Sequence, residues 1–377
     1  MPEPAALDDH FAEQFPLSPL DDHLVHQTPD PIRIMWTGDP RAYDRYWMVC
    51  HDATGEALVA VGGSLYPNLD RAEAYAIVVV DGKHSSVRSF RSIGADRVDL
   101  RLGPIVPTVV RGLREWRFVL EPNDWGIEFD ITFEDTTRQV FREPLSRSST
   151  GVPPGRRGDV TSGFESFGNV SGWVKSHGRR VEMGPGSIGT RDRHWGTGRG
   201  VGGPAMSLGG RLHVGTNGNA FVKFPEWGLW GDRVFYPFGD ARPGYATVFK
   251  PRRWLRFDPS TRIFVEGEVE YDLDTGESVR LRYEKIGHQT AHLRCGMYGG
   301  SPGSGIHQGA WDGPDMTEGE TFDLEDPATR SDLRGLDEHL CRVTRDDGTT
   351  VLGIYQTIDP LAFEACASGR SGWSFLS

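Results

Sequence analysis

Glycine and proline are unusually frequent in this chain, and they limit what it can fold into. The 377 residues include 48 glycines and 25 prolines, about a fifth of the chain, whereas average usage of the two together is about 12%. Both residues weaken a helix interior, and both are common in turns. The 11 tryptophans, 19 phenylalanines and 10 tyrosines favour strands. We therefore expect many short strands joined by turns rather than long helices.

Two segments show the period-2 alternation of a half-buried strand. Residues 127–133 (IEFDITF) and 279–284 (VRLRYE) each alternate apolar and polar side chains without a break. Short turn dipeptides separate other apolar runs: Asp81-Gly82, Thr275-Gly276 and Asp347-Gly348. The sequence therefore predicts an antiparallel all-β protein with few, short helices.

The apolar periodicity stops near residues 145–161, where Ser, Gly, Pro and Arg dominate. We interpret residues 149–160 as a linker between two β domains, 31–148 and 161–377, preceded by an N-terminal arm over 1–30. The second domain contains a stretch rich in Gly, Pro and Asp at about 299–335, which predicts a long loop or lid. The similar strand-and-turn texture of the two domains is that of two related barrels.

Charge and apolar content exclude several classes of protein. The formal net charge is −12, without a basic run, so we expect no nucleic-acid binding and no attachment to an anionic membrane. No apolar stretch is long enough for a membrane span, and the first thirty residues do not read as a secretory signal. Four cysteines without a C-x-x-C pair are typical of a reduced, cytoplasmic protein. The alternating charges from Arg88 to Asp99 indicate a solvated, salt-bridged surface.

Three familiar motifs occur in contexts that do not support them. Residues 198–203 satisfy G-x-G-x-x-G, but neither a buried strand before them nor a helix after them is indicated. Residues 299–303 satisfy G-x-S-x-G without the strand–turn–helix setting of a nucleophile elbow. His288 and His292 have the spacing of zinc-binding histidines, but residue 289 is Gln rather than Glu. We expect neither a cofactor nor a metal.

The segment 184–199 (GPGSIGTRDRHWGTGR) is the densest in chemically capable residues. On a strand, the i, i+2 spacing of Asp192 and His194 places both on one face. A carboxyl and an imidazole inside a barrel make an acid–base pair, and burial would raise the pKa of the carboxyl so that it donates a proton. In the alternative interpretation, Asp192 pairs with a neighbouring arginine and braces the end of the strand.

Aromatic side chains are the second group of candidate functional residues. They can line a pocket for a large apolar ligand, and their faces stabilise a passing cation. Ordinary barrel core is the competing explanation, and for most of them the better one. The candidates for substrate binding are Trp173, Trp195, Trp227, Trp230 and Tyr236.

The signature-like residues of the chain are 164–168 (FESFG), Gly172 and 189–196 (GTRDRHWG). They resemble the G-x-R-D-x-x-W-G signature of the double-lipocalin (calycin-like) superfamily. That superfamily includes carotenoid 1,2-hydratase (hydroxyneurosporene synthase), kievitone hydratase, tocopherol cyclase and decalin-forming Diels–Alderases. Elements of the first domain look like its bacterial branch, and the resemblance spans roughly residues 20–360.

The resemblance implies two lipocalin-like β-barrels side by side, with an apolar pocket within or between them. In the hydratases and cyclases of the superfamily a carboxylic acid protonates an isolated C=C bond, and water or an internal hydroxyl captures the cation, without a metal or redox cofactor. Asp192 matches the acid of the motif. His194, where many relatives have serine, and Trp195 match its aromatic end. Tyr271, beside Asp272, is a candidate for a later element.

The sequence therefore predicts a cofactor-independent hydratase, cyclase or isomerase acting on an isoprenoid- or steroid-like small molecule. Asp192 is the expected general acid, and His194 is expected to assist it or to orient water. Two alternatives stay open: a non-catalytic carrier of hydrophobic ligands, and a pericyclase that only folds a reactive polyene. We expect a cytoplasmic monomer or homodimer.

Overall fold

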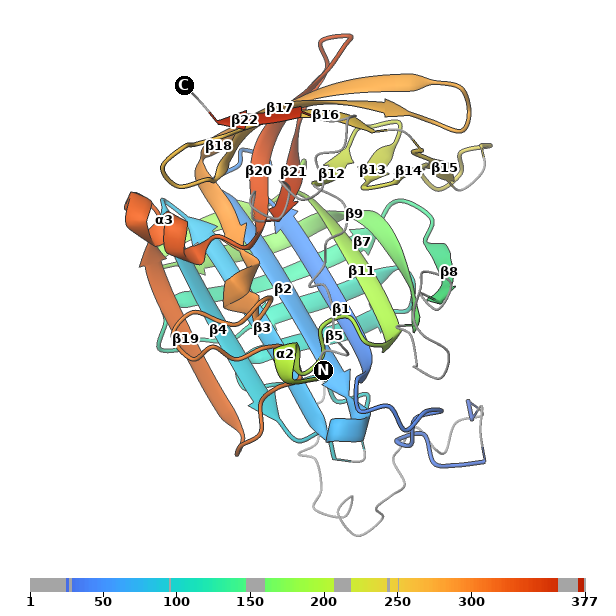
Figure 1. Cartoon of the computed structure of the whole chain (residues 1–377), viewed down its shortest axis with the longest axis vertical. Coiled ribbons are helices and arrows are strands. Elements are labelled where there is room, and N and C mark those ends of the chain that lie inside the picture. Colours follow the sequence, from blue (N-terminus) through green and yellow to red (C-terminus); the bar gives the residue numbers. More distant parts are fainter. Residues whose placement is uncertain are drawn as a thin grey trace.

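The computed structural model describes residues 25–26, 29–94, 96–146, 160–206, 218–242, 245–249, 251–358 and 372–375. Two curled, mainly antiparallel sheets make up almost all of this part of the chain (Figure 1). Helical structure is confined to short pieces, listed here in chain order: η2 (Pro67–Leu69), α2 (Gly203–Met206), η4 (Leu293–Gly296) and α3 (Pro327–Leu333). The predicted all-β class is confirmed.

The first sheet is built mostly from the N-terminal half of the chain. Its central path runs β19 (Met316–Asp323), β4 (Lys83–Arg91), β3 (Arg71–Val80), β2 (Ala57–Tyr66), β1 (Ala42–His51), β11 (Ile188–Thr197), β9 (Val160–Ser176), β7 (Ile127–Asp135), β6 (Glu115–Leu120) and β5 (Ile105–Arg111). Two further strands, β8 (Val140–Ser146) and β10 (Arg179–Met183), pair with β9. The sheet curls around an apolar interior that includes Phe129, Ile131 and Phe133 of β7.

The second sheet is built from the C-terminal half. Its order is β15 (Tyr245–Thr247), β14 (Arg233–Phe235), β13 (Gly228–Trp230), β12 (Asn219–Lys223), β21 (Thr350–Ile358), β20 (Leu336–Arg345), β18 (Ser278–His292), β17 (Phe264–Asp272), β16 (Arg252–Phe257) and β22 (Gly372–Phe375). All neighbours are antiparallel except β16 and β22. Its own apolar interior includes Tyr271, Tyr283 and Tyr355.

A third apolar cluster joins the two sheets. It combines Trp47, Leu58 and Ile77, on the face of the first sheet away from its interior, with residues such as Phe221 and Leu340 of the second sheet. Strands β1, β2 and β3 are therefore buried on both faces. This explains why their sequences are nearly continuous apolar runs, whereas β7, which has one outer face, alternates.

The strands are not divided between the sheets at residues 149–160. Strands β9, β10 and β11 follow that segment, yet they belong to the first sheet, where Val170 and Val174 fill its interior. Moreover, β8 and β9 on either side of the segment pair with each other. Turn-forming residues are equally suited to a linker and to a hairpin connection, so composition alone does not distinguish them. The predicted N-terminal arm lies almost wholly outside the described residues.

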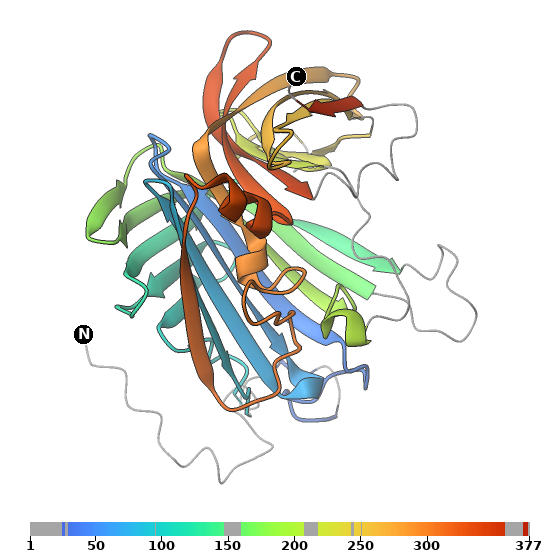
Figure 2. The ribbon, with the colours of Figure 1, turned by 60° about the vertical axis from the view of Figure 1, so that its left-hand side comes forward.

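The stretch predicted as a long loop contains regular structure. Residues 316–323 form β19, the edge strand beside β4, and α3 follows it (Figure 2). Arg88 of β4 is 1% exposed and forms ion pairs with Glu318 and Glu320 of β19. Arg88 is therefore not part of a solvated surface. The sequence of β19 is polar and therefore suggests a loop. Its glutamates instead pair with a buried cation, Arg88, which is far away in the sequence and is not revealed by any local pattern.

Other local expectations can be placed directly. At the Asp81-Gly82 turn both residues have positive φ, 52° and 71°, as a tight hairpin requires. Cys50, Cys295 and Cys341 are buried free thiols, and Cys366 lies outside the described residues. Within the described ranges there is no helix with the length and apolar character needed to cross a membrane.

Candidate active site

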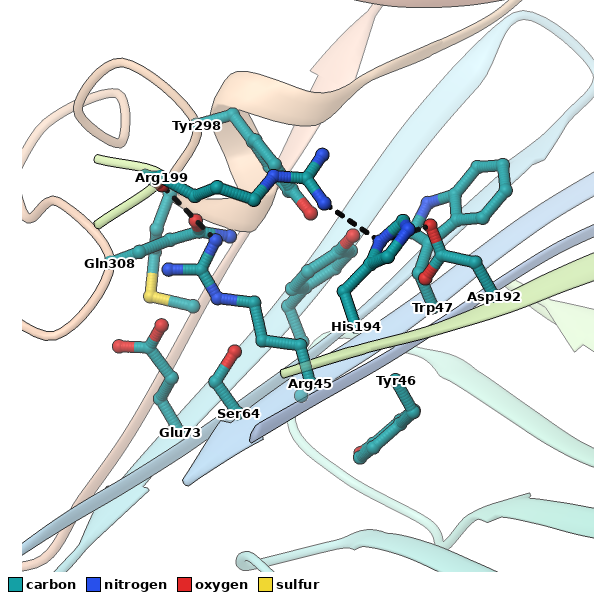
Figure 3. Close-up of a pocket in the computed structure, with 13 residues that line it drawn as sticks. Arg45, Tyr46, Trp47, Ser64, Glu73, Asp192, His194, Arg199, Tyr298 and Gln308 are labelled. Carbon is teal, nitrogen blue, oxygen red and sulfur yellow. Dashed lines mark hydrogen bonds and ion pairs between the residues drawn. The ribbon is translucent and has the colours of Figure 1, made fainter. Parts of the chain in front are cut away.

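A small cavity lies on the face of the first sheet that is turned away from its apolar interior (Figure 3). Its volume of 40 Å³ is room for about three water molecules. The lining residues are Arg45, Tyr46, Trp47, Gly63, Ser64, Glu73, Tyr75, Asp192, His194, Arg199, Met297, Tyr298 and Gln308. Polar and charged groups dominate this lining, so the cavity differs from the large apolar pocket that we expected.

Strand pairing brings the reactive residues together. In the register of β1 and β11, Trp47 lies opposite Asp192 and Arg45 lies opposite His194. Asp192 and His194 therefore share one face of β11, as their spacing predicts. That face lies outside the curled interior of the first sheet rather than inside a barrel. Arg193, between them, points to the other face and binds Asp44 at 2.6 Å.

His194 is enclosed by two carboxyl groups and one guanidinium. Its Nδ1 atom is 3.1 Å from Asp192 Oδ2 and 2.7 Å from Arg199 Nη1, and its Nε2 atom is 3.4 Å from Glu165 Oε1. Glu165 lies on β9 opposite Asp192 and is 1% exposed. Arg199 donates to Nδ1 when that nitrogen is bare, whereas a protonated Nδ1 donates to Asp192. Nδ1 is thus the atom at which this cluster gains or loses a proton.

The charges around His194 decide its protonation. Burial disfavours the imidazolium, and Arg199 opposes it too, but the carboxylates of Asp192 and Glu165 outweigh both effects and raise the pKa of His194. The predicted carboxyl–imidazole pair is therefore present as an interacting unit. In its protonated form the ring can hand a proton to a group in the cavity, with Asp192 compensating the positive charge.

A glycine on the neighbouring strand makes room for the ring. Gly163 of β9 lies opposite His194, and a Cβ atom at residue 163 would lie 2.2 Å from His194 Cδ2 and 2.2 Å from the carbonyl oxygen of Arg193. Any side chain at this position would therefore displace the imidazole or the strand. Two consecutive glycines do the same on β2, where Gly62 accommodates the ring of Tyr75 and Gly63 that of Tyr46.

Glu73 is a second acid in the cavity, and the sequence analysis missed it. It lies on β3, is 3% exposed, accepts a hydrogen bond from the hydroxyl of Tyr66, and accepts another from the backbone N–H of Gly309 at 2.8 Å. Burial raises the pKa of Glu73 to about 7, against the opposing effect of these hydrogen bonds and of Arg45. A glutamate between two alanines, in a strand that is otherwise apolar after Arg71, was the available signal.

A third acid lies behind the cavity, on the second sheet. Glu338 of β20 is fully buried, and its Oε1 accepts a hydrogen bond from Gln356 Nε2 at 2.6 Å. Its Oε2 has no hydrogen-bond partner among the described residues. Burial raises the pKa of Glu338 to about 8, and the negative charges of Asp337 and Asp192 act in the same direction. Acids from both sheets therefore surround the contact between them.

The segment that follows η4 covers the cavity. Met297, Tyr298 and Gln308 contribute side chains to the lining, and the Gln308 carbonyl accepts from the N–H of Gly202 at 2.7 Å. The loop that carries Arg199 is thereby tied to this cover. The predicted lid region and the rejected G-x-G-x-x-G segment thus meet over the same site.

The predicted aromatic residues lie elsewhere. Trp173 is stacked under Arg180, and Trp195 packs against Phe141 and Phe164. Three others belong to the apolar interior of the second sheet: Trp227, Tyr236 and Tyr271. Trp230 packs edge-on against Trp47, with ring centroids 5.6 Å apart, and so stands one layer behind the lining. The large number of aromatic residues in the sequence suggested these rings as candidates, but only strand register identifies Trp47 and Tyr75 as lining residues.

The structure also places the two histidines that have the spacing of zinc ligands. His292 is buried and its Nδ1 lies 2.7 Å from Asp337, whereas His288 is partly exposed near Glu325. Over the described ranges no group of three or more His, Cys, Asp or Glu residues is arranged to hold a metal ion.

One family model matches the chain over residues 17–221, more than half of its length, and it describes a family of unknown function (DUF8625). The chain belongs to this family. The matched part of the DUF8625 chain contains the strands that carry Arg45, Glu73, Asp192 and His194. The segment that covers the cavity lies beyond it.

Among solved structures, the DUF8625 chain is similar to kievitone hydratase from Nectria haematococca, at 13% sequence identity and a TM-score of 0.38. The match covers 84% of this chain and 88% of that one. No curated protein matches the chain by sequence. Because the TM-score is low, the acid–base role proposed below rests on the geometry of the site, and the proposed substrate class rests on the resemblance of residues 189–196 described above.

Proposed function

We propose that this protein is an acid–base enzyme, of the hydratase, cyclase or isomerase type, that protonates a C=C bond of an isoprenoid- or steroid-like small molecule. Asp192 and His194 act as one proton-transfer unit, and Glu73 is a second acid–base group. The observation that carries the proposal is the position of His194. This buried imidazole lies between two carboxyl groups at the edge of a cavity that also contains a carboxyl with a pKa of about 7.

The proposed step begins with the proton on the Asp192–His194 unit. The π electrons of the substrate form a C–H bond with this proton, and the neighbouring carbon becomes a cation. In a hydration, the oxygen of water bonds to that carbon and its extra proton passes to Glu73 or back to the unit. In an isomerisation, a proton instead passes from an adjacent carbon to Glu73 or back to the unit, and the electrons of that C–H bond form the new C=C bond. The rings of Trp47, Tyr75 and Tyr298 line the cavity and stabilise positive charge.

The size of the cavity limits how such a substrate binds. A space of 40 Å³ admits only a few non-hydrogen atoms. Only the reacting end of an isoprenoid-like molecule therefore enters, unless the segment from Tyr298 to Gln308 moves aside. We therefore expect the substrate to have a small reacting end group, while the rest of the molecule stays outside the cavity.

The test is incubation of the protein in D₂O with a pool of terpenoids, prenylated phenols and unsaturated steroids, followed by mass spectrometry. The expected product carries one deuterium at a former alkene carbon. An added mass of water then separates hydration from isomerisation or cyclisation.

Two variants locate the acid. Asp192→Asn should lower turnover by about 10²–10⁴-fold, because the amide cannot exchange a proton with His194. Asp44→Asn is the matched control on the neighbouring strand, since Asp44 points to the other face and pairs with Arg193. A wild-type rate in Asp192→Asn would refute the assignment and favour a pericyclase. Thermal stabilisation by ligands without any product would favour the carrier.

A further inference from the structure

Arg45 is a buried cation in the cavity and has no ion-pair partner among the residues that the structure describes. Its residue exposure is 8%, and it is one of the lining residues. One terminal nitrogen, Nη1, donates to the backbone carbonyl of Arg199 at 3.2 Å, and Nη2 makes only a long contact of 3.5 Å with the hydroxyl of Tyr66. Nε–H has no hydrogen-bond partner among the described residues.

The surroundings of Arg45 are aromatic rather than anionic. The guanidinium lies 4.5 Å from the ring centre of Tyr43 and 5.6 Å from that of Tyr66. The nearest acid, Glu73, already accepts hydrogen bonds from Tyr66 and Gly309. A buried charge without an ionic partner is costly to maintain in a folded protein. Such a cost is typical of groups that are kept for a ligand rather than for stability.

The edge of the guanidinium that makes only the long contact with Tyr66 has a defined shape. Nε–H and Nη2–H lie on the same edge and point in parallel, and this fork matches the two oxygens of a carboxylate. Arg45 points to the side of the cavity that is lined by Ser64, Glu73 and Gln308 (Figure 3). The cavity volume of 40 Å³ is also close to that of about three water-sized groups, which is the size of one carboxylate.

We propose that the cavity binds the carboxylate group of its ligand on the Nε–Nη2 edge of Arg45, so that the substrate class is unsaturated carboxylic acids. The part of this proposal that concerns the substrate class rests on the function proposed above. The part that concerns carboxylate binding does not depend on turnover. Asp192 and His194 line the same cavity. A carboxylate on Arg45 fills most of its 40 Å³, so the unsaturated carbon chain lies beside the proton-transfer unit once the segment from Tyr298 to Gln308 moves aside.

Binding is tested with pairs of acids and their amides, which have nearly the same shape but differ in charge. The probes are crotonate with crotonamide and geranate with geranamide, measured by isothermal titration calorimetry on the full chain. At least one acid should bind tenfold or more tightly than its amide. Equal binding within both pairs, or no binding of either acid, would overturn the proposal.

Two arginine variants assign the site. Arg45→Met should abolish the preference for the acid, whereas Arg193→Met, on the opposite face of the adjacent strand, should retain it. Arg45→Met should also unfold at a urea concentration as high as wild type or higher, because a buried unpaired charge has been removed. A lower urea midpoint would show that Arg45 is structural, and a preference for the acid that survives in Arg45→Met would show that another group binds the carboxylate; either result would overturn the proposal. Deuterium incorporation is measured separately, so loss of the proposed function would leave the binding result intact.

Discussion

The Nδ1 atom of His194 has two competing neighbours, and the outcome of that competition sets the chemistry of the site. Arg199 holds the neutral ring and Asp192 holds the imidazolium, at 2.7 and 3.1 Å respectively. Because both contacts are made at the same nitrogen, protonation exchanges one partner for the other with little movement of the ring. The group is therefore suited to transferring a proton repeatedly without rearranging the strand that carries it.

The space beside His194 gives the first prediction. Gly163→Ala should abolish deuterium incorporation and lower the stability by about 1–3 kcal/mol, because the new Cβ overlaps the imidazole and a backbone oxygen. Urea unfolding and the D₂O assay measure the two effects. Gly112→Ala is the control, since a Cβ there meets nothing within 4 Å. An active and equally stable Gly163→Ala would contradict the packing described around His194.

Glu338 gives a prediction about pH. Its pKa of about 8 lies above the pKa of about 4.3 of an unfolded glutamate. The unfolded chain therefore releases this proton first, and stability falls as pH rises from about 4.5 to 8. Neighbouring titratable groups are Asp192, Asp337 and Tyr75.

Glu338→Gln keeps an acceptor for Gln356 but cannot ionise. It should be more stable than wild type at pH 8 by at most about 5 kcal/mol, and the gain should disappear near pH 4. Urea unfolding at several pH values measures the difference. Glu121→Gln, at an exposed ion pair with Arg101, is the control for the general effect of removing a surface charge. A gain that does not depend on pH would refute a buried, protonated Glu338.

At the scale of strands, β19 is held by a buried charge in addition to two apolar side chains, Met316 and Phe322, which pack against the cluster between the sheets. Its residues are partly exposed, yet Arg88 beneath it is almost completely buried. The double variant Glu318→Gln/Glu320→Gln should cost about 2–4 kcal/mol, because it leaves the cation without anionic partners. Hydrogen-exchange mass spectrometry should show β19 losing protection before β2 and β3. Uniform loss of protection across the first sheet would show that β19 has no independent opening.

Strand patterns were readable from the sequence, but strand partners were not. Alternation predicts β7 directly, and the i, i+2 spacing predicts that Asp192 and His194 share a face. Arg45 and Glu165 reach His194 only because β1 and β9 flank β11 in one particular register. That register depends on contacts between residues more than a hundred positions apart in the case of β1, and no local pattern encodes it. The aromatic candidates failed to line the cavity because apolar cores use the same side chains.

At the scale of the whole molecule, an apolar cluster belongs to both sheets. Trp47 packs against Phe221 and Trp230, with ring centroids 5.5 and 5.6 Å apart, so side chains of both sheets share one apolar cluster. Calorimetric unfolding should therefore give a single transition in which both sheets melt together. Two separate transitions would show that each sheet is stable by itself.

Burial of β1, β2 and β3 on both faces also affects how this family can change over evolutionary time. In a strand with one outer face, every second position tolerates substitution with little effect on packing, and β7 is such a strand. In β2 every residue is enclosed, so a substitution there must suit either the interior of the first sheet or the contact with the second. In the strands that carry Arg45 and Glu73, a substitution at almost any position would disturb buried packing. New specificities would therefore arise more readily in the segment that covers the cavity than in the sheet that forms its floor.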